Sequence, residues 1–202
     1  MDVELYDRQT MLDLKPVESA TVVGIGGTGS WSALFLAMSG CNHLYLMDGD
    51  LTERSNFNRL PMPVEGNIGV QKTELMSKLI ASLRPEAEVT RLGRATMFSL
   101  VTTEGTIFDC TDSQPVQAML YKFAQENNRK YIRVGYDGTH ITVTDRVPAW
   151  KTSGVQREGY EVFPSWVVPA ALAACFGVAK AMYEDGIKVI GDLKEFKMKE
   201  VS

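Results

Sequence analysis

The sequence lacks the features that would place this 202-residue chain in a membrane or basic nucleic-acid-binding class. Its first residues, MDVELYDRQT, contain no basic stretch followed by an apolar core, and no later apolar run reaches the roughly 20 residues needed to cross a bilayer. The formal net charge of −4 also lacks the basic excess that unspecific binding to a phosphate backbone requires. We therefore expect a soluble, cytoplasmic protein whose partners include neither a membrane nor a nucleic acid.

Cysteine and histidine are scarce. The three cysteines, Cys41, Cys110 and Cys175, are far apart and form no CxxC pair, so neither a disulfide framework nor a cysteine-built zinc site is indicated. Each is expected in the apolar core, where free cysteine is commonly buried. His43 and His140 have no metal-ligand spacing, and we assign both to structure.

The composition that is present, 45% hydrophobic and 23% charged residues, is typical of one globular domain covering residues 1–202. Hydrophobic periodicity predicts alternating strands and helices. The expected strands are 21–23, 44–47, 89–92, 106–109, 131–134 and 141–144, and the expected helices are 31–38, 70–83, 114–125 and 169–182.

This alternation predicts an α/β fold, with a Rossmann-like, mostly parallel sheet, helices on both faces and antiparallel strands toward the C-terminus. Such sheets bind ligands at the carboxyl ends of their strands. The polar segment 149–159 has no periodicity and is expected to be a loop. The charged tail from Asp192 onward is expected to be peripheral.

A glycine-rich turn follows the first expected strand. In the run GIGGTG, the glycines allow phosphate oxygens to approach amide donors at a helix N-terminus; they are Gly24, Gly26, Gly27 and Gly29. Asp48 ends the next strand, about 20 residues beyond the turn, where a carboxylate can accept from ribose hydroxyls. Residues 21–48 therefore predict a nucleotide-binding βαβ unit, which fits a nicotinamide cofactor as well as ATP.

Further polar residues stand near the carboxyl ends of strands. They are Asn56 and Arg59 in SNFNR, Lys72 in GVQK and Asp112 in DCTDS. The pyrophosphate of a dinucleotide is served largely by backbone amides and the helix dipole. A triphosphate carries more charge, and its reaction requires cations, so these residues favour ATP.

Six motifs in this order resemble the ThiF/MoeB/HesA family, the bacterial relatives of the ubiquitin-activating enzymes. They are YDRQ at 6–9, GIGGTG at 24–29, LMDGD at 46–50, SNFNR at 55–59, GVQK at 69–72 and DCTDS at 109–113. The resemblance implies a single adenylation domain that uses ATP and Mg²⁺. Its substrate would be the C-terminal glycine carboxylate of a small ubiquitin-like or sulfur-carrier protein, and it would release pyrophosphate.

The resemblance also implies roles for individual residues. The four glycines and Asp48 would bind the nucleotide, Asn56, Arg59 and Lys72 would contact phosphates, and Asp112 would coordinate magnesium. Arg8 matches the arginine that reaches into a neighbouring subunit's site, which implies a homodimer. A crossover loop at about 149–162 would cover the incoming tail.

The chemistry agrees with these roles. An α-carboxyl has a pKa near 3.5, so it is ionised at neutral pH and needs no general base. Repulsion from the phosphates is the obstacle, and Arg8, Arg59, Lys72 and Mg²⁺ would stabilise charge moving onto the leaving pyrophosphate.

The chain departs from the family pattern in three ways. It lacks the two CxxC pairs that hold a structural zinc in many members, so no zinc is expected. It has no cysteine between positions 149 and 164, so we expect the chemistry to stop at the acyl-adenylate. The segment between Arg8 and Val22 is shorter than usual, which bears on whether Arg8 reaches across a dimer.

Three other functions stay open. A nicotinamide-dependent oxidoreductase would share the glycine turn, although no clear proton donor stands beside a hydride site. A non-catalytic scaffold could keep the fold to bind a ubiquitin-like partner, but it would not need Arg59, Lys72 and Asp112. A ThiF-like enzyme that acts on a tRNA base is a third alternative, and the net negative charge of the chain disfavours it.

Overall fold

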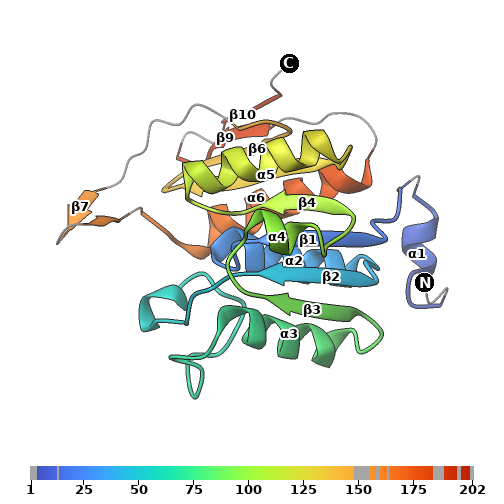
Figure 1. The fold of residues 1–202 in the computed structure, drawn as a ribbon, viewed down its shortest axis with the longest axis horizontal. Helices are drawn as coiled ribbons and strands as arrows, with labels where there is room; N and C mark the ends of the chain where they lie inside the picture. The colour runs from blue at the N-terminus through green and yellow to red at the C-terminus, as the bar shows by residue number, and fades with distance from the viewer. Residues whose placement is uncertain are drawn as a thin grey trace.

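The computed structural model describes residues 4–12, 14–147, 155–157, 160–162, 164–183, 189–194 and 197–200. Eight strands form one sheet in the order β10-β9-β6-β5-β4-β1-β2-β3 (Figure 1). Their bounds are β1 Ser19–Val23, β2 His43–Met47, β3 Glu88–Leu92, β4 Thr106–Asp109, β5 Tyr131–Asp137, β6 His140–Thr144, β9 Val189–Asp192 and β10 Lys197–Glu200. The helices are α1 Asp7–Thr10, α2 Gly27–Met38, the 3-10 helix η1 Arg54–Asn56, α3 Lys72–Leu83, α4 Met97–Leu100, α5 Gln114–Glu126 and α6 Val167–Met182.

Strands β1 to β5 are parallel, whereas β6, β9 and β10 add antiparallel pairs. The register aligns the ends of four parallel strands. Val23 at the end of β1 pairs with Met47 of β2 and Asp109 of β4, and Met47 pairs with Leu92 of β3. The loops that leave these strands therefore start side by side at one edge of the sheet, which we call the carboxyl edge.

Helices cover both faces of the sheet, as predicted. On one face, Leu36 of α2, Met76 of α3 and Ala173 of α6 belong to one buried apolar cluster with strand residues. On the other face, Leu100 of α4 and Leu120 of α5 belong to a second cluster. The central strands β1, β4 and β5 are buried along most of their length because helices cover both sides.

The C-terminal part differs from expectation. The tail from Asp192 onward was expected to be peripheral, and its strand β10 forms the edge of the sheet by pairing with β9, which pairs with β6. Segment 149–159 was expected to be a loop, and its residues 149–154 and 158–159 lie outside the described residues. Within the predicted crossover loop, β7 (Val155–Arg157) and β8 (Tyr160–Val162) form an antiparallel ladder outside the main sheet (Figure 1).

The cysteines do not all lie in the core. Cys41 is buried as expected, but Cys110 is half-buried and Cys175 is exposed. The expectation for Cys175 was wrong because the uniformly apolar α6 places one side in the core and leaves the other toward solvent.

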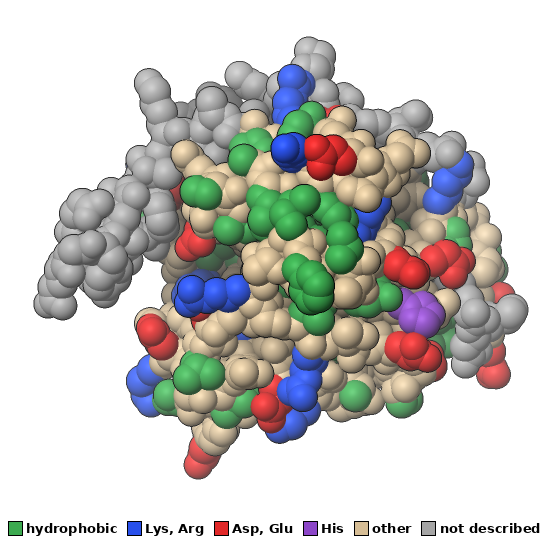
Figure 2. All heavy atoms as spheres, in the orientation of Figure 1, with side chains coloured by type: hydrophobic (Ala, Val, Ile, Leu, Met, Phe, Trp, Pro, Cys, Tyr) green, Lys and Arg blue, Asp and Glu red, His purple; other side chains and the backbone are tan. Residues whose placement is uncertain are grey.

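The outer side of α4 is an apolar surface. Figure 2 shows hydrophobic side chains gathered over this helix, and Met97, Phe98 and Val101 are 44%, 83% and 64% exposed. Exposed apolar side chains gathered in this way are typical of surfaces that contact another protein. In the described part of the chain, no helix has both the length and the apolar character required to span a bilayer.

Candidate nucleotide site at the carboxyl edge

The glycine-rich turn joins β1 to α2 at the carboxyl edge. Gly24 has a φ of +84°, which L side chains rarely adopt. A Cβ on Gly29 would overlap the carbonyl oxygen of Gly24, so the first turn of α2 packs directly on the peptide backbone. A Cβ on Gly26 would meet no atom within 4 Å. The turn is thus closely packed at Gly29 and open at Gly26, at a helix N-terminus whose amides can bind phosphate oxygens.

Asp48 follows β2, and two backbone amides hold its carboxylate. The amide of Ile25 donates to Oδ2 at 2.7 Å, and the amide of Asp50 donates to Oδ1 at 2.8 Å. Burial raises the pKa of Asp48 above its ordinary value, while the charge of Lys72 and the two amides act in the opposite direction. The carboxylate is therefore fixed beside the turn, and its remaining lone pairs can accept from ribose hydroxyls.

Lys72 begins α3 at the same edge. Its Nζ lies 3.1 Å from Oδ2 of Asp50, and the two side chains are 13% and 59% exposed. Asp50 belongs to the LMDGD motif, but the sequence assigned it no role. Its ion pair joins residues 22 positions apart, which only the fold reveals.

Arg59 lies against the start of α2. A Cβ on Gly27 would lie 3.2 Å from Cδ of Arg59 and 2.9 Å from the hydroxyl of Tyr136. The guanidinium donates to a carbonyl and a side-chain amide of its own loop, at 2.9 and 3.0 Å. Burial raises the pKa of Tyr136, while a hydrogen bond with Ser165 and the charge of Arg59 oppose the shift. No sequence signal indicated Tyr136, which the length of β5 brings to this edge.

Asn56 lies in the connection from β2 to α3, and Asp112 lies between β4 and α5. Oδ1 of Asn56 accepts from the amide of Glu53 at 3.1 Å, and its amide nitrogen donates to no group among the described residues. Asp112 is exposed before α5, and its carboxylate makes no hydrogen bond or ion pair with described residues. Mg²⁺ is commonly bound by one or two carboxylates together with phosphate oxygens, so Asp112 suits it chemically. Among the described residues, no group of three or more His, Cys, Asp or Glu could hold a metal ion.

A buried network fixes the end of β4 beside Asp112. Asp109 is 0% exposed, and its Oδ2 accepts from the hydroxyl of Tyr131 at 2.5 Å. Its Oδ1 accepts from the amide and hydroxyl of Thr111 at 3.0 and 2.9 Å and lies 3.6 Å from Arg133. Asp109 therefore orders the end of β4.

Arg8 lies far from the other predicted residues. It belongs to α1, which Figure 1 shows outside the opposite edge of the sheet, where the parallel strands begin. The neighbouring Gln9 donates to the carbonyl of Ser39 at 2.9 Å, just beyond the C-terminal end of α2. The 12 residues of α2 span about 18 Å, so this end is remote from the glycine turn. Arg8 does not join the site of its own chain.

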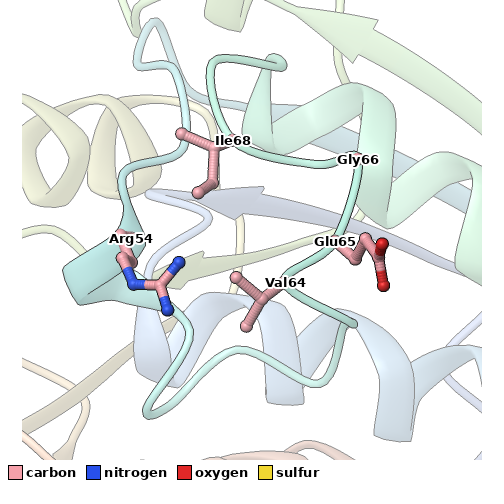
Figure 3. Close-up of a pocket in the computed structure, with 5 residues that line it drawn as sticks. All are labelled: Arg54, Val64, Glu65, Gly66 and Ile68. Atoms are coloured by element: carbon pink, nitrogen blue, oxygen red, sulfur yellow. The ribbon is translucent and has the colours of Figure 1, made fainter.

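A hollow of about 490 Å³ lies beside η1 (Figure 3). It is lined by Arg54, Val64, Glu65, Gly66 and Ile68. In Figure 3 the guanidinium of Arg54 points toward Val64, whereas the carboxylate of Glu65 points away. None of the predicted site residues lines this hollow, so it is separate from the nucleotide site.

Comparison with known proteins adds sequence relatives. Residues 1–182 match the model of the ThiF family. The adenylyltransferase and sulfurtransferase MOCS3 of Drosophila sechellia is 32% identical over 131 residues, which cover 59% of this chain and 29% of that protein. The tRNA threonylcarbamoyladenosine dehydratase of Escherichia coli strain K12 is 32% identical over 139 residues, which cover 61% of this chain and 50% of that protein. The matches thus span half or less of these relatives.

Solved structures share the fold. The crystal structure of PaaA has a TM-score of 0.79 at 22% identity, over 100% of this chain and 73% of PaaA. The crystal structure of E. coli MccB with ATP has a TM-score of 0.74 at 18% identity, over 92% of this chain and 63% of MccB. At these identities the likeness concerns the fold.

Proposed function

The chain belongs to the ThiF family, and on this premise we propose that it is an ATP- and Mg²⁺-dependent adenylyltransferase. It joins AMP to the C-terminal glycine carboxylate of a small ubiquitin-like or sulfur-carrier protein and releases pyrophosphate. The observation that carries this proposal is the pair of cations at the glycine turn: Arg59 lies against Gly27, and the charge of Lys72 acts on Asp48. The pyrophosphate of a dinucleotide can bind to the amides at the α2 N-terminus, so it requires Arg59 and Lys72 less than a triphosphate does.

Two comparisons support the use of ATP and the transfer of an adenylyl group. The relative from D. sechellia is named an adenylyltransferase, and MccB of the same fold was crystallised with ATP. The open space at Gly26 suits a phosphate group. A nicotinamide oxidoreductase has no comparable support here.

The proposed chemistry begins with a carboxylate that is already ionised, so no residue needs to act as a general base. The turn and Asp48 hold the nucleotide, while Asn56, Arg59 and Lys72 bind the phosphates. Mg²⁺, held by Asp112 and phosphate oxygens, would neutralise charge on the leaving pyrophosphate. Positioning the carboxylate in line with the α-phosphate supplies the rest of the acceleration.

In this proposal Arg8 acts in the nucleotide site of the other protomer of a dimer, because the glycine turn of its own chain is remote. Leu5, Met11 and Leu12 near α1 are 49%, 75% and 56% exposed, which suits a segment that packs on a partner. The protein is therefore proposed to be a homodimer. Mixing an Arg8→Ala chain with an Arg59→Ala chain should restore part of the activity that each variant lacks alone.

The reaction is proposed to end at the acyl-adenylate. Burial raises the pKa of Cys41 and of Cys110 to about 12, so neither forms a thiolate readily. Cys175 is exposed but lies on α6, and burial raises its pKa as well. A thioester to Cys175 that survives incubation with carrier and ATP would contradict this part.

ATP–pyrophosphate exchange tests the main proposal. Exchange is measured for wild type, Arg59→Ala and Asp112→Ala, each in the presence of a candidate carrier protein that ends in glycine. Arg54→Ala serves as a control because Arg54 is a nearby arginine that lines the separate hollow. We expect carrier-dependent exchange that both site variants lose and the control keeps. Tight carrier binding without exchange would favour the scaffold function instead.

The dehydratase relative gives one specific reason to test a tRNA-directed activity, since it is as similar in sequence as the adenylyltransferase. The net charge of −4 opposes this alternative. Nucleotide turnover that requires tRNA and ignores the carrier would establish it.

A further inference from the structure

The strand order lays out a nucleotide along the carboxyl edge. β1, β2 and β3 are neighbours in register, with Val23, Met47 and Leu92 side by side at their ends. Adjacent strands are about 4.8 Å apart. In the proposed function the phosphates lie at the turn after β1 and the ribose at Asp48 after β2, which would put the base at the end of β3.

Arg94 occupies this third position. It follows the end of β3, and its stem crosses to Gly49, the residue after Asp48. A Cβ on Gly49 would overlap Cγ of Arg94 and would lie 3.0 Å from its Nε and 3.2 Å from its Cδ. Gly49 is not among the glycines with positive φ, so its missing side chain serves the close approach of Arg94.

The guanidinium of Arg94 is available for a ligand. Arg94 is exposed, and within the described part of the chain it makes no hydrogen bond or ion pair. Arg91 of β3 differs, because it lies 3.6 Å from a carboxylate oxygen of Glu74.

We propose that Arg94 determines base recognition by stacking its guanidinium plane on the adenine ring of ATP, an inference that rests on the proposed function. The guanidinium is planar and weakly hydrated, and it stacks readily on aromatic faces. A phosphate on the ribose is a poorer ligand at this place, because the carboxylates of Asp48 and Asp50 would repel it. Arg94 thus recognises the base, while the glycine turn, Arg59 and Lys72 bind the triphosphate.

The test compares ATP with ribose 5-triphosphate, which lacks the base, in equilibrium binding to the protein without a carrier. Arg94→Ala should bind ATP about two- to five-fold more weakly than wild type, the range expected for an exposed cation–π contact. Its affinity for ribose 5-triphosphate should not change. Arg94→Lys should bind ATP more weakly than wild type but no more weakly than Arg94→Ala, because an ammonium keeps the charge but has no plane to stack.

Arg91→Ala is the matched control, since it removes an exposed arginine three positions away. It should leave both affinities unchanged. An equal loss for both ligands in Arg94→Ala would indicate simple charge attraction and overturn the inference, as would no loss for ATP. Base-dependent binding without carrier-dependent exchange would support Arg94 and count against adenylation, so the two failures are distinguishable.

Discussion

Substitutions in the glycine turn should have separate effects on folding and on nucleotide binding. Gly26 and Gly29 stand three positions apart in the same motif, yet their surroundings differ. A methyl group on Gly26 meets nothing within 4 Å, whereas one on Gly29 overlaps the carbonyl oxygen of Gly24 and lies 3.2 Å from the Cβ of Cys110. Gly26→Ala should therefore impair the nucleotide site, and Gly29→Ala should impair the fold.

The magnitudes follow from these contacts. Overpacking at Gly29 should cost about 1–3 kcal/mol, which lowers Tm by roughly 2–12 °C in a chain of this size. Alanine at Gly26, the N-cap of α2, should cost about 1 kcal/mol or less. Its methyl group fills the space assigned to phosphate oxygens, and losing hydrogen bonds to a charged group is worth about 1.5–3 kcal/mol, or roughly ten- to hundred-fold in ATP affinity.

Thermal denaturation with and without Mg²⁺ and ATP measures both effects, because a ligand that binds the folded state raises Tm. Wild type should gain stability from ATP, whereas Gly26→Ala should lose at most about 2–4 °C of intrinsic Tm but most of the gain from ATP. If Gly26→Ala is stabilised by ATP as strongly as wild type, the phosphates do not lie over Gly26. If Gly29→Ala unfolds at the wild-type temperature, the packing of α2 on the turn is not as the structure has it.

Three further substitutions test the carboxyl edge and the exposure of α6. Asp50→Asn releases Lys72 from an ion pair worth about 0–1 kcal/mol. Calorimetry should therefore show that ATP binds up to about five-fold more tightly. Weaker binding would contradict the assignment of Lys72 to the phosphates. Tyr131→Phe removes a hydrogen-bond donor to the buried Asp109 and should lower the free energy of unfolding in urea by about 1–3 kcal/mol. An unchanged urea midpoint would contradict the network. A thiol reagent should modify one cysteine in the native protein, and Cys175→Ser should abolish that fast reaction.

The parallel half of the fold was predictable because its signals are local. The turn at Gly24 ends a β-branched run, and Asp48 ends the next one, so both could be placed at strand ends. Strand ends share an edge in a parallel sheet. In the structure, Asp48 and Arg59 contact the turn, and Lys72 lies close enough to act on the charge of Asp48.

The remaining features depend on contacts that the sequence does not display. β10 has the sequence KMKE, and its charges look like a solvated tail, yet lysine on an edge strand is a common means of preventing unwanted strand pairing. The ion pair of Lys72 with Asp50 and the approach of Arg94 to Gly49 both join different loops. Arg8 was recognised by its motif, but its distance from the turn follows only from the direction of α2.

The carboxyl edge combines a rigid part with an adaptable part, and the division follows burial. Asp109 at 0% exposure is held by Tyr131 and Thr111, and the Asp48 carboxylate by two amides, so the frame under the turn and ribose is fixed before any ligand binds. The exposed residues Arg94 and Asp112 have no partner within the described chain to give up. In the proposed function, the fixed groups would therefore bind the ribose and the phosphates, and the exposed ones would bind the base and the metal.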